Sequence, residues 1–330
     1  MIRGSEERTR APRVSVAVPL FNEEGVLSEF LRRLARVLDG LSGGPHEMVL
    51  VDDGSTDRSF EILREAASSD PRLTAISLSR NFGHQCALTA ALDRVTGDLV
   101  VVMDGDLQDA PESIPLLLAE QEKGYDVVFA KRLGRKEAWP LRLCYFLFYR
   151  LIAYVANIQL PRDAGDFAVL TRRVVDRLKG LPERHRYLRG LRAWVGFRQT
   201  GVAVERSERY AGASKYGFWK LWRLALDGIF AFSMAPLRAA ALLGFVTILG
   251  TLLYVAYAVY AKLFLHQSPP GFTALLVAMT LFAGIQLLFL GVIGEYIGRI
   301  YEETKGRPHY IVREVAGRAG VAAAPSNDRV

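Results

Sequence analysis

Two carboxylates separated by one glycine are the sharpest chemical signal in this sequence. Asp104, Gly105 and Asp106 follow a short apolar run, and Gln108 comes two positions later. Carboxylate and amide oxygens suit hard divalent cations such as Mg²⁺ or Mn²⁺, which keep substrate phosphates among their ligands. Gly105 lets the backbone approach a ligand closely. We therefore predict a metal and phosphate site here, rather than a set of ordinary surface acids.

A second acidic motif, Asp52-Asp53-Gly54-Ser55, also follows an apolar run. Carboxylate oxygens accept hydrogen bonds from ribose hydroxyls or from a base N–H, so this motif suits the recognition of a nucleoside. The alternative is a plain turn, because Asp-Gly is favoured in turns.

The elements that position these motifs alternate along the chain. Strands are predicted at 14–18, 47–51, 73–78 and 98–103, and helices at 24–39, 57–67 (with Asp57 as a possible N-cap) and 84–95. This alternation predicts an α/β fold with a largely parallel sheet. Ligands bind such sheets at the carboxyl ends of the strands. Asn22-Glu23-Glu24, Asp52-Asp53 and Asp104-Gly105-Asp106 all fall there, so we expect them to form one site.

Two long apolar stretches, 237–261 and 272–297, follow this domain. Each exceeds the roughly 20 residues that a helix needs to cross the hydrocarbon core of a bilayer. The alternative, two buried helices of a large soluble protein, usually leaves a polar face. Pro269-Pro270-Gly271 predicts a turn between them, and hence a hairpin. Because Lys and Arg flank its outer ends, we expect both flanks on the cytoplasmic side of the inner membrane.

Segments 139–158 and 215–232 mix aromatic residues with Arg and Lys, which is typical of helices lying in the membrane interface; packing on the domain is the alternative. Residues 1–13 are polar, with no apolar run behind them that would indicate a signal peptide. The predicted organisation is a flexible N-terminus (1–13), a catalytic domain (14–232), a hairpin (237–297) and a cytoplasmic C-terminal tail (298–330).

The formal net charge of +7 limits the classes of partner. A basic excess can indicate nucleic acid, but beside two apolar stretches it indicates anionic lipid head groups and phosphate substrates, so we expect no nucleic-acid partner. Cys86 and Cys144 are too few for a disulfide framework or a zinc site.

Several motifs together resemble the inverting family 2 glycosyltransferases, which have a GT-A fold. The motifs shared with that family stand at 18–24 (Val-Pro-Leu-Phe-Asn-Glu-Glu), 52–57 (Asp-Asp-Gly-Ser-Thr-Asp), 80–85 (Arg-Asn-Phe-Gly-His-Gln) and 104–112. Later motifs, at 163–167, 209–216 and 294–301, resemble the polyprenyl-phosphate group, which includes bactoprenol glucosyltransferases and dolichyl-phosphate mannose synthases. The resemblance covers about residues 14–314.

The resemblance implies a role for each matching residue. It assigns donor binding to Pro19, Asn22, Glu24, Asp52, Asp104 and Gly105, metal binding to Asp104, Asp106 and Gln108, catalysis to Asp104 and Asp166, and phosphate binding to Arg132, Arg209, Ser214 and Lys215. The alternatives are a turn cap for Asp166 and a solvated basic face for the cations. Ala168 departs from the family, which often has Arg there, so one phosphate or sugar contact is not expected.

The implied reaction is inverting transfer of a hexose from a nucleotide-sugar to undecaprenyl or another polyprenyl phosphate. Residues 184–209 are most similar to the bactoprenol glucosyltransferases, so UDP-glucose is the first donor candidate and GDP-mannose the second. A processive polysaccharide synthase would show a Gln-x-x-Arg-Trp motif and more spans. A non-catalytic sensor of nucleotide-sugars would have lost an acid at position 104, 106 or 166.

Small residues in the second apolar stretch permit close helix approach: Gly284, Gly291, Gly294 and Gly298. Together with the family resemblance, they predict a homo-oligomer, with a tetramer as the expected state.

Overall fold

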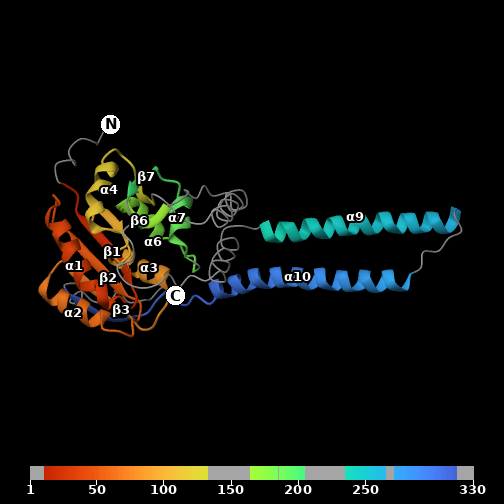
Figure 1. Ribbon diagram of the computed structural model, residues 1–330, viewed down its shortest axis with the longest axis horizontal. Helices are drawn as coiled ribbons and strands as arrows, with labels where there is room; N and C mark the ends of the chain where they lie inside the picture. Colours follow the sequence, from red (N-terminus) through yellow and green to blue (C-terminus); the bar gives the residue numbers. More distant parts are fainter. Residues whose placement is uncertain (1–10, 133–163, 185, 205–234, 265–270, 318–330) are drawn as a thin grey trace. The chain divides into compact units, whose positions relative to one another are not determined.

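The computed structural model describes residues 11–132, 164–184, 186–204, 235–264 and 271–317 (Figure 1). The sheet and the residues from Arg307 onward belong to one compact unit, and the two long apolar helices belong to another.

The first unit contains a sheet and surrounding helices. Its strands are β1 (Val14–Leu20), β2 (Glu47–Asp52), β3 (Leu73–Leu78), β4 (Leu99–Val102), β5 (Val127–Arg132), β6 (Ala164–Thr171), β7 (Gln199–Val204) and β8 (Val312–Gly317). Its helices are α1 (Glu24–Asp39), α2 (Ser59–Ser69), α3 (His84–Arg94), α4 (Ile114–Gln121), α6 (Arg172–Lys179) and α7 (Leu188–Trp194), with a short 3₁₀ turn η1 (Pro111–Ser113). Every strand and helix expected between residues 14 and 103 is present.

Asp57 is not the N-cap of the second helix. That helix begins two residues later than expected, at Ser59, and Arg58 precedes it. Asp57 instead accepts hydrogen bonds from the backbone N–H of Ser59 at 3.0 Å and of Glu24 at 3.2 Å, and so joins the starts of α1 and α2.

The strand order is β7-β5-β6-β4-β1-β2-β3-β8. The four strands β4-β1-β2-β3 run parallel, whereas β6 and β8 pair antiparallel with β4 and β3. Right-handed crossovers put α1 and α2 on one face, and α3, whose connection runs back from β3 to β4, on the other (Figure 1). The mostly parallel sheet confirms the predicted α/β fold.

Part of the core lies between the sheet and α1. This helix buries one apolar face, made of Val26, Leu27, Phe30, Leu34 and Leu38. Strands β1 and β2 are buried along almost their whole length, as expected of parallel strands covered on both faces. Pro19 stands in β1 beyond its last pair with β4, so the ring interrupts no bond between those two strands.

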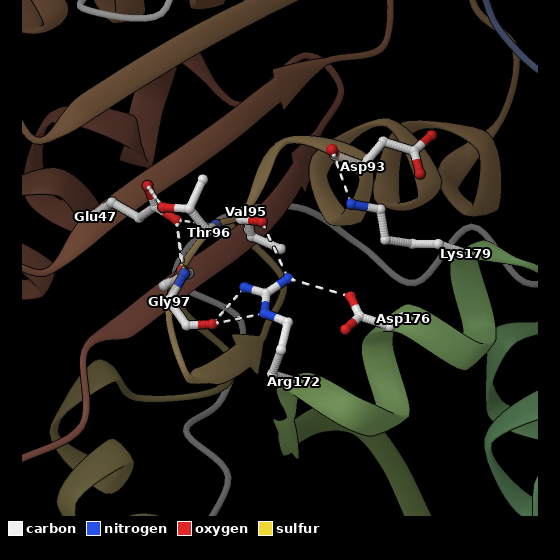
Figure 2. Close-up of polar contacts among 9 residues, drawn as sticks. Glu47, Asp93, Val95, Thr96, Gly97, Arg172, Asp176 and Lys179 are labelled. Carbon is white, nitrogen blue, oxygen red and sulfur yellow. Dashed lines mark hydrogen bonds and ion pairs between the residues drawn. The ribbon is translucent and has the colours of Figure 1, made fainter. Parts of the chain in front are cut away.

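A cluster of polar contacts at the amino edge of the parallel strands joins α6 to the end of α3 and the loop that follows it. Figure 2 shows Arg172, the first residue of α6, donating to the carbonyl oxygens of Val95 (3.1 Å) and Gly97 (2.9 Å). Lys179, at the end of α6, donates to the carbonyl oxygen of Asp93 at 3.0 Å. Both cations therefore cap the carboxyl end of α3, where the helix dipole favours positive charge.

The chain returns to the sheet after the second apolar helix. Residues 312–317, which the sequence placed in a C-terminal tail, form β8 and pair antiparallel with β3. The sheet therefore gains an edge strand from the far end of the sequence.

The second unit contains α9 (Ala235–Phe264) and α10 (Phe272–Thr304). Both are long and apolar enough to cross a membrane, and none of either apolar window is buried. They include the expected spans 237–261 and 272–297 and extend beyond them. They lie side by side: a Cβ added to Gly244 of α9 would meet the ring of Phe289 of α10 at 3.9 Å (Figure 1). The expected interface helices, 139–158 and 215–232, lie outside the described residues.

The glycines of α10 that predict close helix approach are not in close contact with α9. A Cβ built at any of them would meet no atom within 4 Å: Gly284, Gly291, Gly294 and Gly298. The oligomer remains a prediction.

Candidate active site

The register of β4 and β6 brings two predicted site residues together. Val102 pairs with Ala168, so the same antiparallel register, continued past the end of β4, sets Asp104 opposite Asp166. The charge of Asp166 helps to raise the pKa of Asp104, as expected of neighbouring carboxylates. The sequence predicted both acids, and the antiparallel strand explains how they meet.

Asp104 lies in an environment that disfavours its charge. Burial, together with the negative charges of Asp166, Asp106 and Asp109, raises the pKa of Asp104 to about 6. His84, at the start of α3, acts in the opposite direction, with Nε2 3.7 Å from Oδ1 of Asp104. A bound cation would favour the ionised carboxylate still more.

Asp166 has the opposite electrostatic setting. Burial alone would raise its pKa, but the charge of Arg189 and the hydrogen bonds from it outweigh burial, and the pKa of Asp166 is lowered. Arg189 donates from Nη2 to Oδ2 at 2.8 Å and from Nε to Oδ1 at 3.2 Å. This two-point contact keeps Asp166 ionised and fixes its orientation.

Arg192 adds a second cation behind Asp166. It is buried, its Nη2 donates to the carbonyl oxygen of Gly165 at 3.3 Å, and its guanidinium lies 5.4 Å from the ring centroid of Phe129. Burial lowers the pKa of Arg192 to about 10. Ala168, the departure from the family, is buried within the sheet, so the guanidinium groups near Asp166 come from α7 instead.

Residues of α3 position both the acids and α7. Oε1 of Gln85 accepts a hydrogen bond from the backbone N–H of Leu188, the first residue of α7, at 2.9 Å. Sequence reasoning missed His84, Arg189 and Arg192 as site residues. The signal for the two arginines was their spacing of three on a short helix, which puts them on neighbouring positions of one face.

The loop after β4 is shaped around Asp106. The backbone N–H of Gln108 donates to Oδ1 of Asp106 at 3.0 Å, and Leu107 between them has a left-handed φ of 59°. Such a conformation is costly for a non-glycine residue and is concentrated at functional sites. Gly105 needs no left-handed backbone; a Cβ there would stand 2.4 Å from the side chain of Leu20.

The carboxylates of this loop suit a divalent cation whose remaining ligands include phosphate oxygens. Among the described residues, no three His, Cys, Asp or Glu side chains form a metal cluster. Two neighbouring carboxylates, Asp104 and Asp106, suffice for a hard cation that takes its other ligands from water and a diphosphate. The predicted ligands therefore suit Mg²⁺ or Mn²⁺ bound together with substrate.

Asp52 ends β2 as a fully buried carboxylate. Its Oδ1 accepts from the backbone N–H of Ser55 at 3.1 Å, and its Oδ2 accepts from the hydroxyl of Ser77 at 3.1 Å. The side chain is thus held in one orientation at the end of β2 by bonds to the protein itself, and its contact with a nucleoside stays a prediction.

Asp53 supports the neighbouring loop. It accepts from the backbone N–H groups of Phe82 (2.7 Å) and Gly83 (2.8 Å), just before α3. Burial raises its pKa, although these two bonds act in the opposite direction. Gly54, with φ +68°, permits the close approach, because a Cβ there would stand 2.5 Å from the backbone of Arg80.

Asn22 and Glu24, predicted to bind the donor, hold the β1–α1 and β2–α2 loops together. Oδ1 of Asn22 accepts from the backbone N–H of Thr56 at 2.9 Å, and Glu24 accepts from that of Arg58 at 3.0 Å. Asn22 has a left-handed φ of 55°, which Asn tolerates well. Donor contact by either side chain stays a prediction.

The predicted phosphate-binding residues cannot be placed in the site. Arg132 ends β5, but its side chain is outside the described part of the structure. Arg209, Ser214 and Lys215 lie outside the described residues. Their role stays a prediction.

Comparisons with known proteins agree with this geometry. The sequence model described as glycosyl transferase family 2 matches residues 15–179. The uncharacterized glycosyltransferase YkcC of Bacillus subtilis is 46% identical over 92% of this chain and 94% of its own length. The SfII prophage-derived bactoprenol glucosyl transferase of Shigella flexneri is 40% identical over 92% of this chain and 98% of its own length.

Among solved structures, the mannosyltransferase PcManGT from Pyrobaculum calidifontis, in complex with GDP-Man and Mn²⁺, is 23% identical. The match covers 88% of each chain, with a TM-score of 0.47.

Proposed function

Because this chain belongs to glycosyltransferase family 2, we propose that it transfers a hexose from a nucleotide-sugar to a polyprenyl phosphate at a membrane surface. UDP-glucose is the first donor candidate, since relatives 39–40% identical over more than 90% of this chain are named bactoprenol glucosyl transferases. The observation that carries the proposal is the opposition of Asp104 and Asp166 at the carboxyl edge of the sheet.

The donor is held at two points along this edge. Asp52 binds the nucleoside, and the Asp104–Asp106 motif with Gln108 would hold a divalent cation beside the diphosphate. When bound, the cation neutralises the charge that grows on the departing nucleoside diphosphate. Burial and the neighbouring carboxylates both disfavour the charge of Asp104, and a bound cation would offset the repulsion among these carboxylates.

The acceptor needs positioning more than deprotonation. A phosphate monoester is already mostly dianionic at neutral pH, so its oxygen can attack the anomeric carbon directly. The bond from that carbon to the diphosphate oxygen breaks, the nucleoside diphosphate leaves, and attack from the opposite face inverts the anomeric centre. Asp166, held ionised by Arg189, stabilises the positive charge that develops on the sugar ring. By resemblance, Arg132, Arg209, Ser214 and Lys215 hold the lipid phosphate.

The apolar helices explain why the acceptor is a lipid. Large side chains of α9 such as Phe245 and Leu253 are each 65% exposed, which bilayer contact would favour and water would not. We propose that α9 and α10 cross the membrane as a hairpin with both flanks cytoplasmic.

Reporter fusions test this topology. Fusions near residue 267 should report the non-cytoplasmic side of the membrane, and fusions after residue 315 should report the cytoplasm. The same side for both would contradict the hairpin.

A donor screen tests the proposed reaction. The full chain in mild detergent is incubated with undecaprenyl phosphate, a divalent cation and radiolabelled UDP-glucose or GDP-mannose, and label in the lipid fraction is measured. We expect transfer from UDP-glucose, with a β-linked product from the α-linked donor by NMR, and none by Asp166→Asn. Transfer from GDP-mannose alone would correct the sugar, and label that reaches only a non-lipid acceptor would overturn the proposal.

A further inference from the structure

A hydrogen-bonded chain joins the last strand of the sheet to the proposed nucleoside carboxylate. Nη2 of Arg313 in β8 donates to Oγ of Ser77 in β3 at 2.7 Å, and that hydroxyl donates to Oδ2 of Asp52 at 3.1 Å. Ser77 and Asp52 are both 0% exposed. A serine hydroxyl has only one proton, so a hydroxyl that accepts from Arg313 has that proton available for Asp52.

A β-bulge gives Arg313 this position. Ser77 pairs with Glu314 and Leu78 pairs with Val312, so Arg313 is the extra residue between two regular pairs. The backbone bond from Ser79 N–H to the carbonyl oxygen of Ile311, at 2.9 Å, continues the pairing on the far side of the bulge. Bulges redirect side chains and are frequent beside active sites. This one directs a guanidinium at Ser77.

Two further contacts limit the freedom of this chain of bonds. The guanidinium of Arg313 lies 5.9 Å from the ring centroid of Phe60, a largely buried residue of α2. The other carboxylate oxygen of Asp52 accepts from the backbone N–H of Ser55. Asp52 is therefore held on one side by its own loop and on the other by Ser77 and Arg313.

We propose that Arg313 is a positioning residue for the donor site: through Ser77 it holds the buried Asp52 carboxylate, and with it the Asp52–Ser55 turn, at the nucleoside end of that site. This inference rests on the proposed role of Asp52 and extends it to a residue that follows the second apolar helix in sequence. The polarised hydroxyl binds the carboxylate more strongly than an unsupported one, because hydrogen bonds in a chain reinforce one another. The segment after α10 thus completes the donor site.

Calorimetric titration of the full chain in detergent with UDP, in the presence of a divalent cation, tests this role. We expect Arg313→Ala to weaken UDP binding by about 3- to 30-fold, the range typical of coupled neighbours. Arg313→Lys should recover much of the loss, because it restores a cationic donor. The KM for the nucleotide-sugar should rise by the same factor, while kcat and the KM for polyprenyl phosphate stay unchanged.

Two comparisons separate positioning from a general effect on the strand. Glu314→Gln, the matched control, removes an exposed ion pair of the same strand with Arg64 (4.0 Å) and should leave UDP binding unchanged. Ser77→Ala should weaken binding, and adding Arg313→Ala to it should weaken binding no further, because the intermediary is already gone.

The outcomes distinguish this inference from the proposed function. Wild-type UDP affinity in Arg313→Ala, or additive losses in the double variant, would overturn the role of Arg313. An equal loss in Glu314→Gln, with matching falls in Tm, would show a structural effect of β8 and also overturn it. A wild-type chain that binds neither UDP nor GDP would instead refute the proposed donor. If the wild type binds GDP and not UDP, the affinities of Arg313→Ala and Glu314→Gln for GDP decide the role of Arg313 by the same criteria.

Discussion

The two halves of the carboxyl edge hold their acidic groups in different ways. In the half formed by the ends of β1, β2 and β3, which we call the nucleotide half, carboxylates accept mainly from backbone N–H groups and hydroxyls: Asp52 from Ser55 and Ser77, and Asp53 from Phe82 and Gly83. In the half formed by the end of β4 and the start of β6, the reaction half, the partners are ionisable. Asp104 lies 3.7 Å from His84, and Asp166 lies 2.8 Å from Arg189.

This difference corresponds to two tasks. Backbone donors cannot leave, so the nucleotide half is organised before a ligand arrives, which lowers the entropic cost of binding. Charged side chains can exchange partners with a charged substrate. In the proposed reaction, this half accommodates a cation, a diphosphate and a phosphate. Its opposed pKa shifts, upward for Asp104 and downward for Asp166, indicate groups with separate roles.

Removing a proposed metal ligand should have the largest effect, because it disrupts the reaction half. Asp106→Asn removes one of the two neighbouring carboxylates, so we expect transfer to fall by at least about 100- to 1000-fold, comparable to the loss of a key electrostatic group. EDTA should abolish wild-type transfer. The measurement is radiolabel transfer to lipid at saturating donor.

The control for this variant is another single acid-to-amide change. Asp176→Asn alters an exposed carboxylate of α6, 3.8 Å from Arg172, and should keep wild-type activity. Full activity of the wild type in EDTA would contradict the proposal that the Asp104–Asp106 motif binds a divalent cation.

Removing the partner of Asp166 should have the next largest effect. In Arg189→Gln, burial of Asp166 is no longer opposed by its nearest cation, so its pKa should rise. We expect transfer to fall by about 10- to 100-fold at neutral pH, with UDP affinity unchanged. Because the wild-type pKa is lowered, Asp166 stays ionised as the pH falls. The variant should lose activity at a higher pH than the wild type does.

The pH–rate profile shows whether Arg189 acts by keeping Asp166 ionised or only by its packing. Arg189→Lys should restore most of the wild-type profile, and Arg198→Gln, which removes an exposed cation stacked over Tyr125, should not change it. A uniform fall in rate with an unshifted profile would mean that Arg189 does not control the ionisation of Asp166.

The nucleotide half is also the half that sequence reasoning predicted better. Its strands are apolar runs, and its acids stand directly after them, so their common edge followed from the parallel fold alone. The partners in the reaction half come from separate elements. Asp166 meets Asp104 only because β6 runs antiparallel to β4, and the direction of a strand is not encoded in its apolar pattern.

Among the elements that were not predicted, α7 and β8 escaped for identifiable physical reasons. The short helix α7, which carries Arg189, is held by bonds to other elements, such as the one that the N–H of Leu188 donates to Gln85, and no periodic pattern reveals them. β8 is a brief edge strand whose pairing with β3 depends on tertiary contacts across most of the chain, so Val312–Gly317 was indistinguishable from a polar tail. Local motifs are readable from sequence, whereas contacts between distant charged side chains depend on a register that is not.

In the nucleotide half, Asp53→Ala should lower the stability of the fold more than it lowers the rate of transfer. It leaves the N–H groups of Phe82 and Gly83 without their acceptor, each at a cost of about 1–3 kcal/mol. We expect a Tm lower by several degrees and a raised KM for the nucleotide-sugar, with kcat at saturating donor reduced less than tenfold. A kcat as low as that of Asp106→Asn would show that the two halves do not act separately.

The smallest effect on transfer should come from the opposite edge of the sheet, where Arg172 ties α6 to the carbonyl oxygens of Val95 and Gly97 (Figure 2). Arg172→Ala leaves those carbonyls without the donor that caps α3, so the unfolding free energy should fall by about 1–3 kcal/mol. Thermal unfolding in detergent should show a Tm lower by a few degrees, about what this change implies for a chain of this size. The kcat and both KM values should stay within about twofold of wild type. The backbone hydrogen bonds between β4 and β6 keep Asp166 opposite Asp104 even when the Arg172 side chain is absent. A selective fall in kcat, with donor affinity unchanged, would contradict this independence: it would mean that Arg172 sets the register of β6, and that the reaction half depends on a contact at the far end of its own strand.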